Sequence, residues 1–130
     1  AIAVSINDYD KNADFSRAAV FAAKAARQVL SGGIKIAKYS LLNINVPAST
    51  VNIKGVKVTH KANDVFHEKY IEKKHKGKTV YFWHVVERVK AKGPASDIDW
   101  LEKGYVTLTP LHFDLTDRSS LKQLRIKYKK

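Results

Sequence analysis

The sequence contains neither cysteine nor methionine, and only 3 of its 130 residues are proline and 6 are glycine. Without cysteine there is no disulfide framework, no thiolate zinc site and no cysteine nucleophile. Long uncharged runs are missing as well, because the longest, residues 39–53, spans 15 residues and includes three asparagines and a proline. This run is too short and too polar to cross a bilayer, and no secretory signal is visible. We therefore expect a soluble, cytoplasmic protein with no membrane partner.

The lack of methionine extends to the first position, where the chain opens on an apolar segment, residues 1–5, that is typical of a buried strand. This start suggests a piece of a longer protein, so part of any catalytic machinery is expected ahead of Ala1. A length of 130 residues suits one domain. Hydrophobic residues at 45% and charged residues at 28% favour a folded chain.

Acidic residues are half as numerous as basic ones, 12 against 24, which gives a formal net charge of +12. Residues 54–92 carry 11 basic and 4 acidic residues, and residues 118–130 carry 6 and none. Such blocks can attract nucleotides or nucleic acid, or they can be the solvated surfaces of a hairpin and a last helix. The basic turn at 73–78 contains no phenylalanine, tyrosine or tryptophan that could serve as a base-stacking platform, so we favour the solvated surface.

Helical spacing of apolar residues predicts one long helix over residues 13–30, with an alanine-rich face suited to close packing on a sheet. Asp10, Asn12 or Asp14 can cap its start. A serine and two glycines at 31–33 end it.

Apolar and β-branched runs bounded by turn residues predict five strands. They are expected at residues 41–46, 56–60, 65–71, 79–89 and 105–109. The third and fourth flank the basic turn and form a long hairpin. Pro110 is expected to take the last strand out of its ladder.

Two shorter helices are expected after the strands. Ser96 and Asp97 can cap a helix that runs through Lys103. An extended arm at 112–116 then leads to a terminal helix that starts within 117–120.

An acidic segment resembles the first half of a calcium loop, with carboxylate or amide oxygens at Asp8, Asp10, Asn12 and Asp14. Alanine stands where such a loop needs its glycine and again where it needs its final glutamate. Helix capping is therefore the preferred role.

In each of two pairs of polar residues, the members lie two positions apart in the sequence. Asp97 and Asp99 could serve a metal on a strand, but at a helix start they cap the helix and complement its dipole, which we favour. His112 and Asp114 could form an imidazole–carboxylate pair for acid–base work at the edge of an active site. A local hydrogen bond or an oligomer contact is the alternative.

Complete catalytic motifs are absent from the sequence. The five histidines include no HExxH pattern, the Gly32-Gly33 step lacks a P-loop lysine, and no serine lies in a GxSxG elbow. The residues by themselves therefore define no complete catalytic set.

Three segments, in this order and spacing, carry a resemblance to a known family. They are Leu41-Leu42-Asn43-Ile44-Asn45-Val46-Pro47, Ile53-Lys54-Gly55-Val56-Lys57-Val58-Thr59, and Ser96-Asp97-Ile98-Asp99 continued by Gly104-Tyr105-Val106-Thr107-Leu108-Thr109-Pro110-Leu111. Smaller cues are residues 1–5, 81–83 and 114–116. Together they resemble the C-terminal half of SurE, the stationary-phase survival protein family of metal-dependent nucleotidases.

The resemblance implies an α/β fold, namely the C-terminal part of a Rossmann-like (SurE-like) fold with a projecting β-hairpin and a C-terminal arm plus helix. Residues 1–60 and 95–110 would form the core, 61–92 the hairpin, and 111–130 an oligomerisation arm and helix, with the N-terminal metal-site portion absent. In the family, an Asp-Asp pair, a serine and an asparagine hold the metal, and all precede the position that matches Ala1. No metal ligand is therefore expected in this chain.

The resemblance also implies an activity and partners. The intact protein would hydrolyse 5'- or 3'-nucleoside monophosphates with a divalent metal, Mg or Mn, and would be a homo-oligomer, a dimer or a tetramer. The expected oligomer contacts are Tyr81, Trp83, Phe113, Leu115, Leu121, Leu124 and Tyr128. The alternatives are a basic nucleic-acid-binding module and a purely structural oligomerisation module, since the family pattern does not explain the charge of +12.

Overall fold

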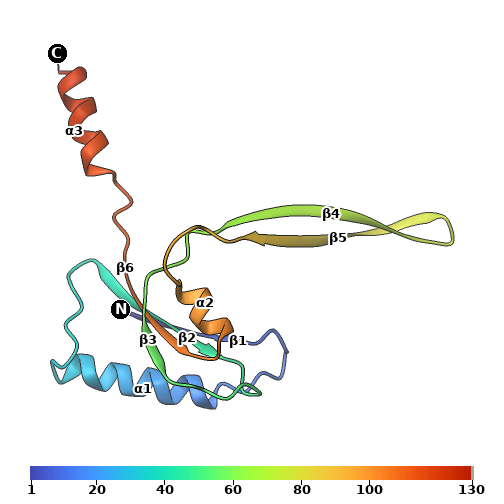
Figure 1. Ribbon diagram of the computed structural model, residues 1–130, viewed down its shortest axis with the longest axis horizontal. Coiled ribbons are helices and arrows are strands. Elements are labelled where there is room, and N and C mark those ends of the chain that lie inside the picture. The colour runs from blue at the N-terminus through green and yellow to red at the C-terminus, as the bar shows by residue number, and fades with distance from the viewer. Residues whose placement is uncertain (130) are drawn as a thin grey trace.

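Four strands form a mixed sheet in the computed structural model, which describes residues 1–129 (Figure 1). The strands lie in the order β1 (Ile2–Asn7), β2 (Ser40–Pro47), β6 (Val106–His112) and β3 (Val56–Val58). β1 pairs parallel with β2, β2 antiparallel with β6, and β6 parallel with β3. The expected α/β class is thus confirmed.

The helix α1 (Ser16–Leu30) covers one face of the sheet, and its alanines make the close contact that the sequence predicts (Figure 1). The buried apolar core consists of Ala18, Ala25, Leu42, Ile44, Val46 and Val106. Small side chains on α1 let the helix backbone approach the branched side chains of β2, which alternate toward it. Burial of this apolar surface is the main stabilising contribution to the core.

The start of α1 differs from the prediction by three residues, whereas its end agrees. The helix begins at Ser16 rather than Ala13, and Phe15 stands at the cap position without a side-chain hydrogen bond. The carboxylate of Asp14 instead accepts a hydrogen bond from the backbone N–H of Ser16 at 2.9 Å. At the other end Gly32 adopts a φ of +79°, which closes the helix as expected.

Pro110 does not end its strand, so that prediction is wrong. β6 continues to His112, and Pro110 lies opposite Leu42 of β2. On the side facing β3, Val106 donates to the Gly55 carbonyl and the Leu108 carbonyl accepts from Thr59, each at 3.0 Å. Alternation along the strand turns the nitrogen of Pro110 to that same side, where β3 has already ended, so no ladder hydrogen bond is lost.

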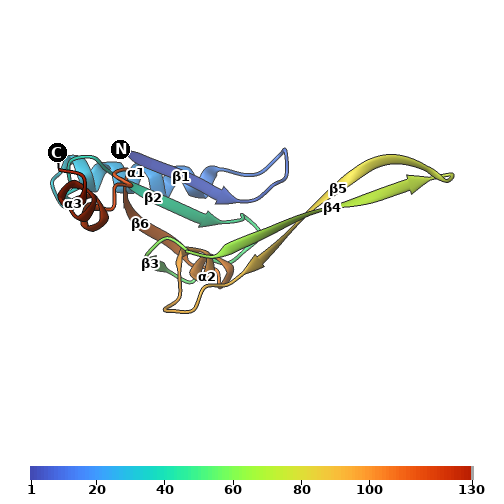
Figure 2. The same ribbon diagram turned by 90° about the horizontal axis from the view of Figure 1, so that it is seen from above.

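The long hairpin forms as predicted and stands apart from the main sheet. β4 (Val65–His75) and β5 (Lys78–Val89) make a separate two-stranded antiparallel sheet that projects away from the core (Figures 1 and 2). β4 runs four residues beyond the predicted end at 71. The turn is only two residues, Lys76 and Gly77, with φ of +51° and +74°, as in a type I′ turn.

The C-terminal arm and helix leave the sheet at a different point from the hairpin (Figure 2). α3 (Arg118–Lys127) is capped by Asp117, whose carboxylate accepts from the N–H groups of Ser119 and Ser120 at 2.9 and 3.1 Å. None of the residues of α3 is buried. Within residues 1–129, no helix combines the length and the apolar character needed to span a membrane.

Candidate functional site

The carboxyl ends of the parallel strands β1 and β2 meet at one edge of the sheet, the place where α/β proteins usually bind ligands. A cavity of about 520 Å³ opens there between the strand ends, the root of the hairpin and the helix α2 (Asp97–Glu102). Ser5 and Asn45 contribute from the strands, Phe66 and Arg88 from the hairpin, and Glu102 from α2.

A polar row forms the floor beneath this cavity. The hydroxyl of Ser5 donates to Oδ1 of Asn45 at 2.6 Å, and Nδ2 of Asn45 donates to Oγ1 of Thr107 at 3.5 Å. These residues lie on the sheet face opposite the apolar face that α1 covers, because side chains alternate along each strand. Further along the same row Thr109 is only 1% exposed, and its hydroxyl has no hydrogen-bond partner among the described residues. The row offers neutral donors and acceptors but no nucleophile with an adjacent base.

An arginine at the root of the hairpin gathers three carboxylates. Arg88 is 19% exposed and pairs with Asp64, with Asp99 at 3.0 Å and with Glu102 at 2.7 Å. Lys90 adds a second cation to Asp99 at 2.8 Å. The hub, which we define as Arg88, Asp64, Asp99 and Glu102, therefore joins the end of β5 and the loop before β4 to α2. Three carboxylates surround its single guanidinium, so the hub carries a net negative charge and Arg88 is not free to bind a phosphate.

Hydrogen bonds hold this hub in its ionised form. The hydrogen bond from Lys90, followed by those from Ser96 and Arg88, lowers the pKa of Asp99 well below its usual range. The backbone N–H of Ala91 is the main cause of the lowered pKa of Asp64. Burial alone would lower the pKa of the Arg88 guanidinium, but the hydrogen bonds to the carboxylates outweigh it and raise the pKa.

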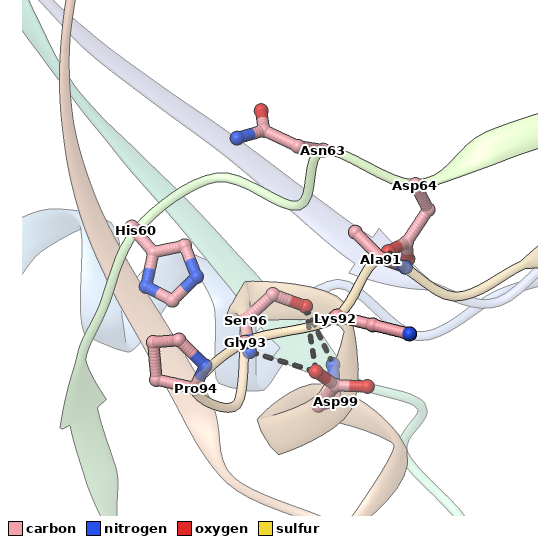
Figure 3. Close-up of a pocket in the computed structure, with 9 residues that line it drawn as sticks. All are labelled: His60, Asn63, Asp64, Ala91, Lys92, Gly93, Pro94, Ser96 and Asp99. Atoms are coloured by element: carbon pink, nitrogen blue, oxygen red, sulfur yellow. Dashed lines mark hydrogen bonds between the residues drawn. The ribbon is translucent and has the colours of Figure 1, made fainter.

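Asp99 caps α2, as predicted, and Asp97 accepts a hydrogen bond from the N–H of Ile98 in the first turn at 2.9 Å. Ser96 and Asp99 form a reciprocal capping box, in which the backbone N–H of Ser96 donates to the Asp99 carboxylate at 2.7 Å and the backbone N–H of Asp99 donates to the Ser96 hydroxyl at 3.4 Å (Figure 3). Asp97 accepts from the N–H of Ala62 at 2.8 Å, which fixes the loop that leads into the hairpin. In Figure 3 Ser96 and Asp99 border a smaller cavity of about 280 Å³ that His60 and Pro94 also line.

The structure does not join His112 and Asp114 into an acid–base pair. His112 ends β6, whereas Asp114 lies in the arm and pairs with Arg118. Hydrogen bonds from Thr116 and then from Arg118 lower the pKa of Asp114. No hydrogen bond links the two predicted partners within residues 1–129. Their role at the edge of an active site stays a prediction.

The acidic segment before α1 forms local turns. Asp8, Asp10 and Asp14 each accept from the backbone N–H two residues later, at 3.0, 2.7 and 2.9 Å. In the part of the chain that the structure describes, no group of three or more histidine, aspartate or glutamate side chains is arranged to hold a metal ion.

The residues predicted as oligomer contacts lie on the projecting segments. Tyr81 and Trp83 share one hairpin face with their rings 6.3 Å apart, edge to face. Leu115 in the arm is 94% exposed, and Phe113, Leu124 and Tyr128 are exposed as well, while Leu121 is partly buried. These positions are accessible to a second protein surface, and the contacts themselves remain predictions.

The sequence analysis did not find the hub around Arg88. Its members come from the loop before β4, the end of β5 and α2, so no short motif contains them. The position of Arg88 opposite Phe66 depends on the hairpin register. The two-residue turn sets this register, so it could not be predicted before the position of the turn was known. A lone arginine at the end of a predicted strand, followed by an acidic helix start, was the one available signal.

Comparison with known proteins identifies the family. Residues 1–68 match the family described as Survival protein SurE. A protein named 5'-nucleotidase SurE from Symbiobacterium thermophilum is 36% identical over 127 residues, which is 96% of this chain and 48% of that protein. One of the same name from Cytophaga hutchinsonii is 37% identical over 133 residues, 99% of this chain and 50% of that protein.

The fold agrees with that of a solved structure. The SurE protein from Aquifex aeolicus superposes with a TM-score of 0.68 at 29% identity, over 97% of this chain and 50% of that one. The chain therefore belongs to the SurE family. It spans about half the length of the relatives it matches.

Proposed function

We propose that this chain is the C-terminal part of a SurE-type phosphatase that hydrolyses 5'- or 3'-nucleoside monophosphates with Mg or Mn. In this proposal the chain supplies the scaffold and the oligomer contacts, and the metal ligands lie outside it. The relatives named 5'-nucleotidase SurE support the activity. A cytoplasmic location is part of the same proposal.

The proposal that the metal ligands lie outside the chain rests on the hydrogen bonds and ion pairs of the carboxylates around α2. Asp64, Asp99 and Glu102 are engaged by Arg88, and Asp97 caps α2. Transfer of a phosphoryl group to water requires a bound cation that stabilises the charge on the transferring group. A cation bound beside Arg88 would compete with a guanidinium for the same oxygens, which supports the proposal that the ligands lie outside this chain.

The edge strand β1 supports a position for the part of the protein that would supply the metal ligands. Its sequence, Ile-Ala-Val-Ser-Ile, is nearly continuously apolar, as in parallel strands that are covered on both faces. In this chain β1 is nevertheless an edge strand, with Ala3, Val4 and Ser5 exposed. A further strand added to this edge would place its carboxyl end beside the cavity at Ser5 and Asn45.

The test is release of phosphate from nucleoside monophosphates by the purified 130-residue chain with Mg²⁺ or Mn²⁺, alone and mixed with the complementary part of the Symbiobacterium thermophilum relative. The chain alone should release no phosphate, and the mixture should release phosphate until the metal is chelated. Metal-dependent release by the chain alone would contradict the assignment of the ligands.

We also propose that the arm and the hairpin build a homo-oligomer, a dimer or a tetramer. The contacts would be Tyr81, Trp83, Phe113, Leu115, Leu121, Leu124 and Tyr128. α3 has 10 residues and buries none of them, whereas isolated helices shorter than about 12 residues are marginal in water. Docking of its apolar stripe on a second copy would supply the missing packing. Removal of residues 118–130 should lower the mass measured by sedimentation, and an unchanged mass would count against this contact.

A further inference from the structure

The end of the hairpin carries a dense positive charge, which we call the lysine tip and define as Lys73, Lys74, Lys76 and Lys78. The segment 73–78 contains no acidic residue. Lys74 lies 3.8 Å from Glu72 in an exposed pair, and no other lysine of the tip is in an ion pair within residues 1–129. Exposed pairs contribute little, so the charge of the tip is almost uncompensated within one copy.

A second set of uncompensated charges, of the opposite sign, lies in the loop that follows β1. This acidic loop, residues 8–14, contains Asp8, Asp10 and Asp14 against one lysine. Together with Ser49 and Thr50 from the loop after β2, the three carboxylates line a hollow of about 510 Å³. Each accepts a hydrogen bond from a nearby backbone N–H, and none is in an ion pair in the part of the chain that the structure describes. The acidic loop therefore has no paired counter-charge within one copy.

The acidic loop and the hairpin lie at the same end of the molecule. The loop follows the carboxyl end of β1, and it projects from the sheet in the same direction as the hairpin (Figures 1 and 2). Asn7 and Tyr9 line the cavity at the carboxyl edge together with Phe66 and Arg88 of the hairpin root. The 11 residues of β4 extend roughly 36 Å at ~3.3 Å per residue. The tip is therefore too far away to reach the acidic loop of its own copy, but it can reach that of another.

The turn residue indicates that the charge of the tip has a role outside the hairpin. Lys76 adopts a φ of +51° at the first position of the type I′ turn, where asparagine, aspartate or glycine is normally favoured. A lysine is unfavourable for such a turn, and this one forms no ion pair with the residues that the structure describes. Stability of the hairpin therefore does not account for it.

The middle of the hairpin offers an apolar face to a second copy. Ile71 lies opposite Trp83, next to the midpoint of β4, and Tyr81 lies on the same face. Their exposed fractions are 42%, 56% and 50%. In a dimer with twofold symmetry, the same patch of each copy faces that of the other. About an axis that crosses the ribbons at this face, the two hairpins run antiparallel, and each tip comes to the root of the other hairpin.

We propose that two copies pair their hairpins antiparallel, so that the lysine tip of each lies on the acidic loop of the other. Opposite charges at the two ends favour this arrangement, because a parallel pair would set the lysines of both tips against each other. The inference rests on the homo-oligomer of the proposed function. It also brings lysines of a second copy to the carboxyl edge, beside which that function expects the metal ligands, so the electrostatic field at this edge depends on the partner.

Exchange of charge between the two surfaces tests the pairing. The tip variant carries Lys74→Glu, Lys76→Glu and Lys78→Glu, and the loop variant carries Asp8→Lys and Asp10→Lys. Either variant alone sets like charges against each other in both contacts of the pair, so sedimentation should give about half the mass of the original chain. In an equimolar mixture each tip faces a loop of opposite charge, and the mass of the original chain should return. A chain that carries all five changes should also keep that mass.

A control variant makes the same change of charge elsewhere. Lys24→Glu, Lys35→Glu and Lys38→Glu are exposed positions on α1 and in the loop before β2, and they should leave the mass unchanged. Circular dichroism checks that every variant is folded. Tip and loop variants that keep the original mass, or a mixture that does not regain it, would overturn the pairing and leave the homo-oligomer standing. An original chain that sediments as a monomer would reject the homo-oligomer and this inference with it.

A second measurement does not depend on charge. The chain has no cysteine, so Lys76→Cys in one copy and Asn12→Cys in another provide the only two thiols. Under oxidising conditions the mixture should give a disulfide-linked dimer of the two different chains, because the tip of one lies on the acidic loop of the other. A linked dimer of Lys76→Cys chains alone would mean that the hairpins meet tip to tip, and it would overturn the antiparallel arrangement.

Discussion

β2 and the hairpin strands all carry large apolar side chains, yet they differ completely in burial. Ile44 of β2 is 0% exposed, whereas Ile71 of β4 is 42% exposed and all of its strand faces solvent. β-branched and aromatic residues thus favour a strand, and the neighbouring elements determine whether it is covered. A two-stranded hairpin is at best marginal by itself, so the stability of this chain resides in the sheet and α1.

The largest expected effect comes from making the same change in both regions. Ile44→Ala should destabilise the chain by roughly 2–5 kcal/mol, because it removes packed apolar atoms and leaves a cavity. Ile71→Ala should cost less than about 0.5 kcal/mol, as is usual for exposed positions. Denaturant unfolding at low protein concentration measures both values. A large, concentration-dependent loss in Ile71→Ala would show that a partner copy covers the hairpin face.

Arg88→Met tests the connection between the two regions. The substitution leaves Asp64 and Asp99 without their guanidinium, and we expect a loss on the order of 2 kcal/mol, below the ~3–5 kcal/mol of a fully buried pair because Glu102 is exposed. Hydrogen exchange should accelerate at Ala62 and Ala91, whose N–H groups bond to Asp97 and Asp64. Arg118→Met, which breaks the exposed pair with Asp114, is the control and should change stability little.

The stabilisation that the hub around Arg88 provides should be lost in acid but not in base. The pKa values of Asp64 and Asp99 lie below the ordinary value of 3.8 in the folded chain, so both groups bind protons less readily folded than unfolded. Their stabilisation is complete above that value and is lost as the pH falls through the lowered folded values. The thermal midpoint should be flat from pH 8 to about 5 and fall below about 4. In Asp64→Asn the fall should be smaller, and an equal fall would assign the acid response to other carboxylates.

The sequence was sufficient for features that depend on neighbouring residues. The alanine face of α1, the glycine that ends it, the Ser96 capping box and the two hairpin strands all follow from local spacing, and the structure confirms them. Features that depend on the order of the strands in the sheet could not be predicted from the sequence. Pro110 stays in its strand because β3 has already ended on that side, and the hub at Arg88 assembles three distant segments. The metal site and the activity depend on what joins the β1 edge.

The smallest expected effect concerns a single residue of the hairpin turn. Lys76→Asn creates an Asn-Gly turn, the favoured type I′ sequence, so the hairpin should gain a few tenths of a kcal/mol, up to ~0.5 kcal/mol. Denaturant unfolding measures this gain. A less stable hairpin would mean that Lys76 contributes to the turn through its side chain, which is the opposite of what its left-handed backbone predicts.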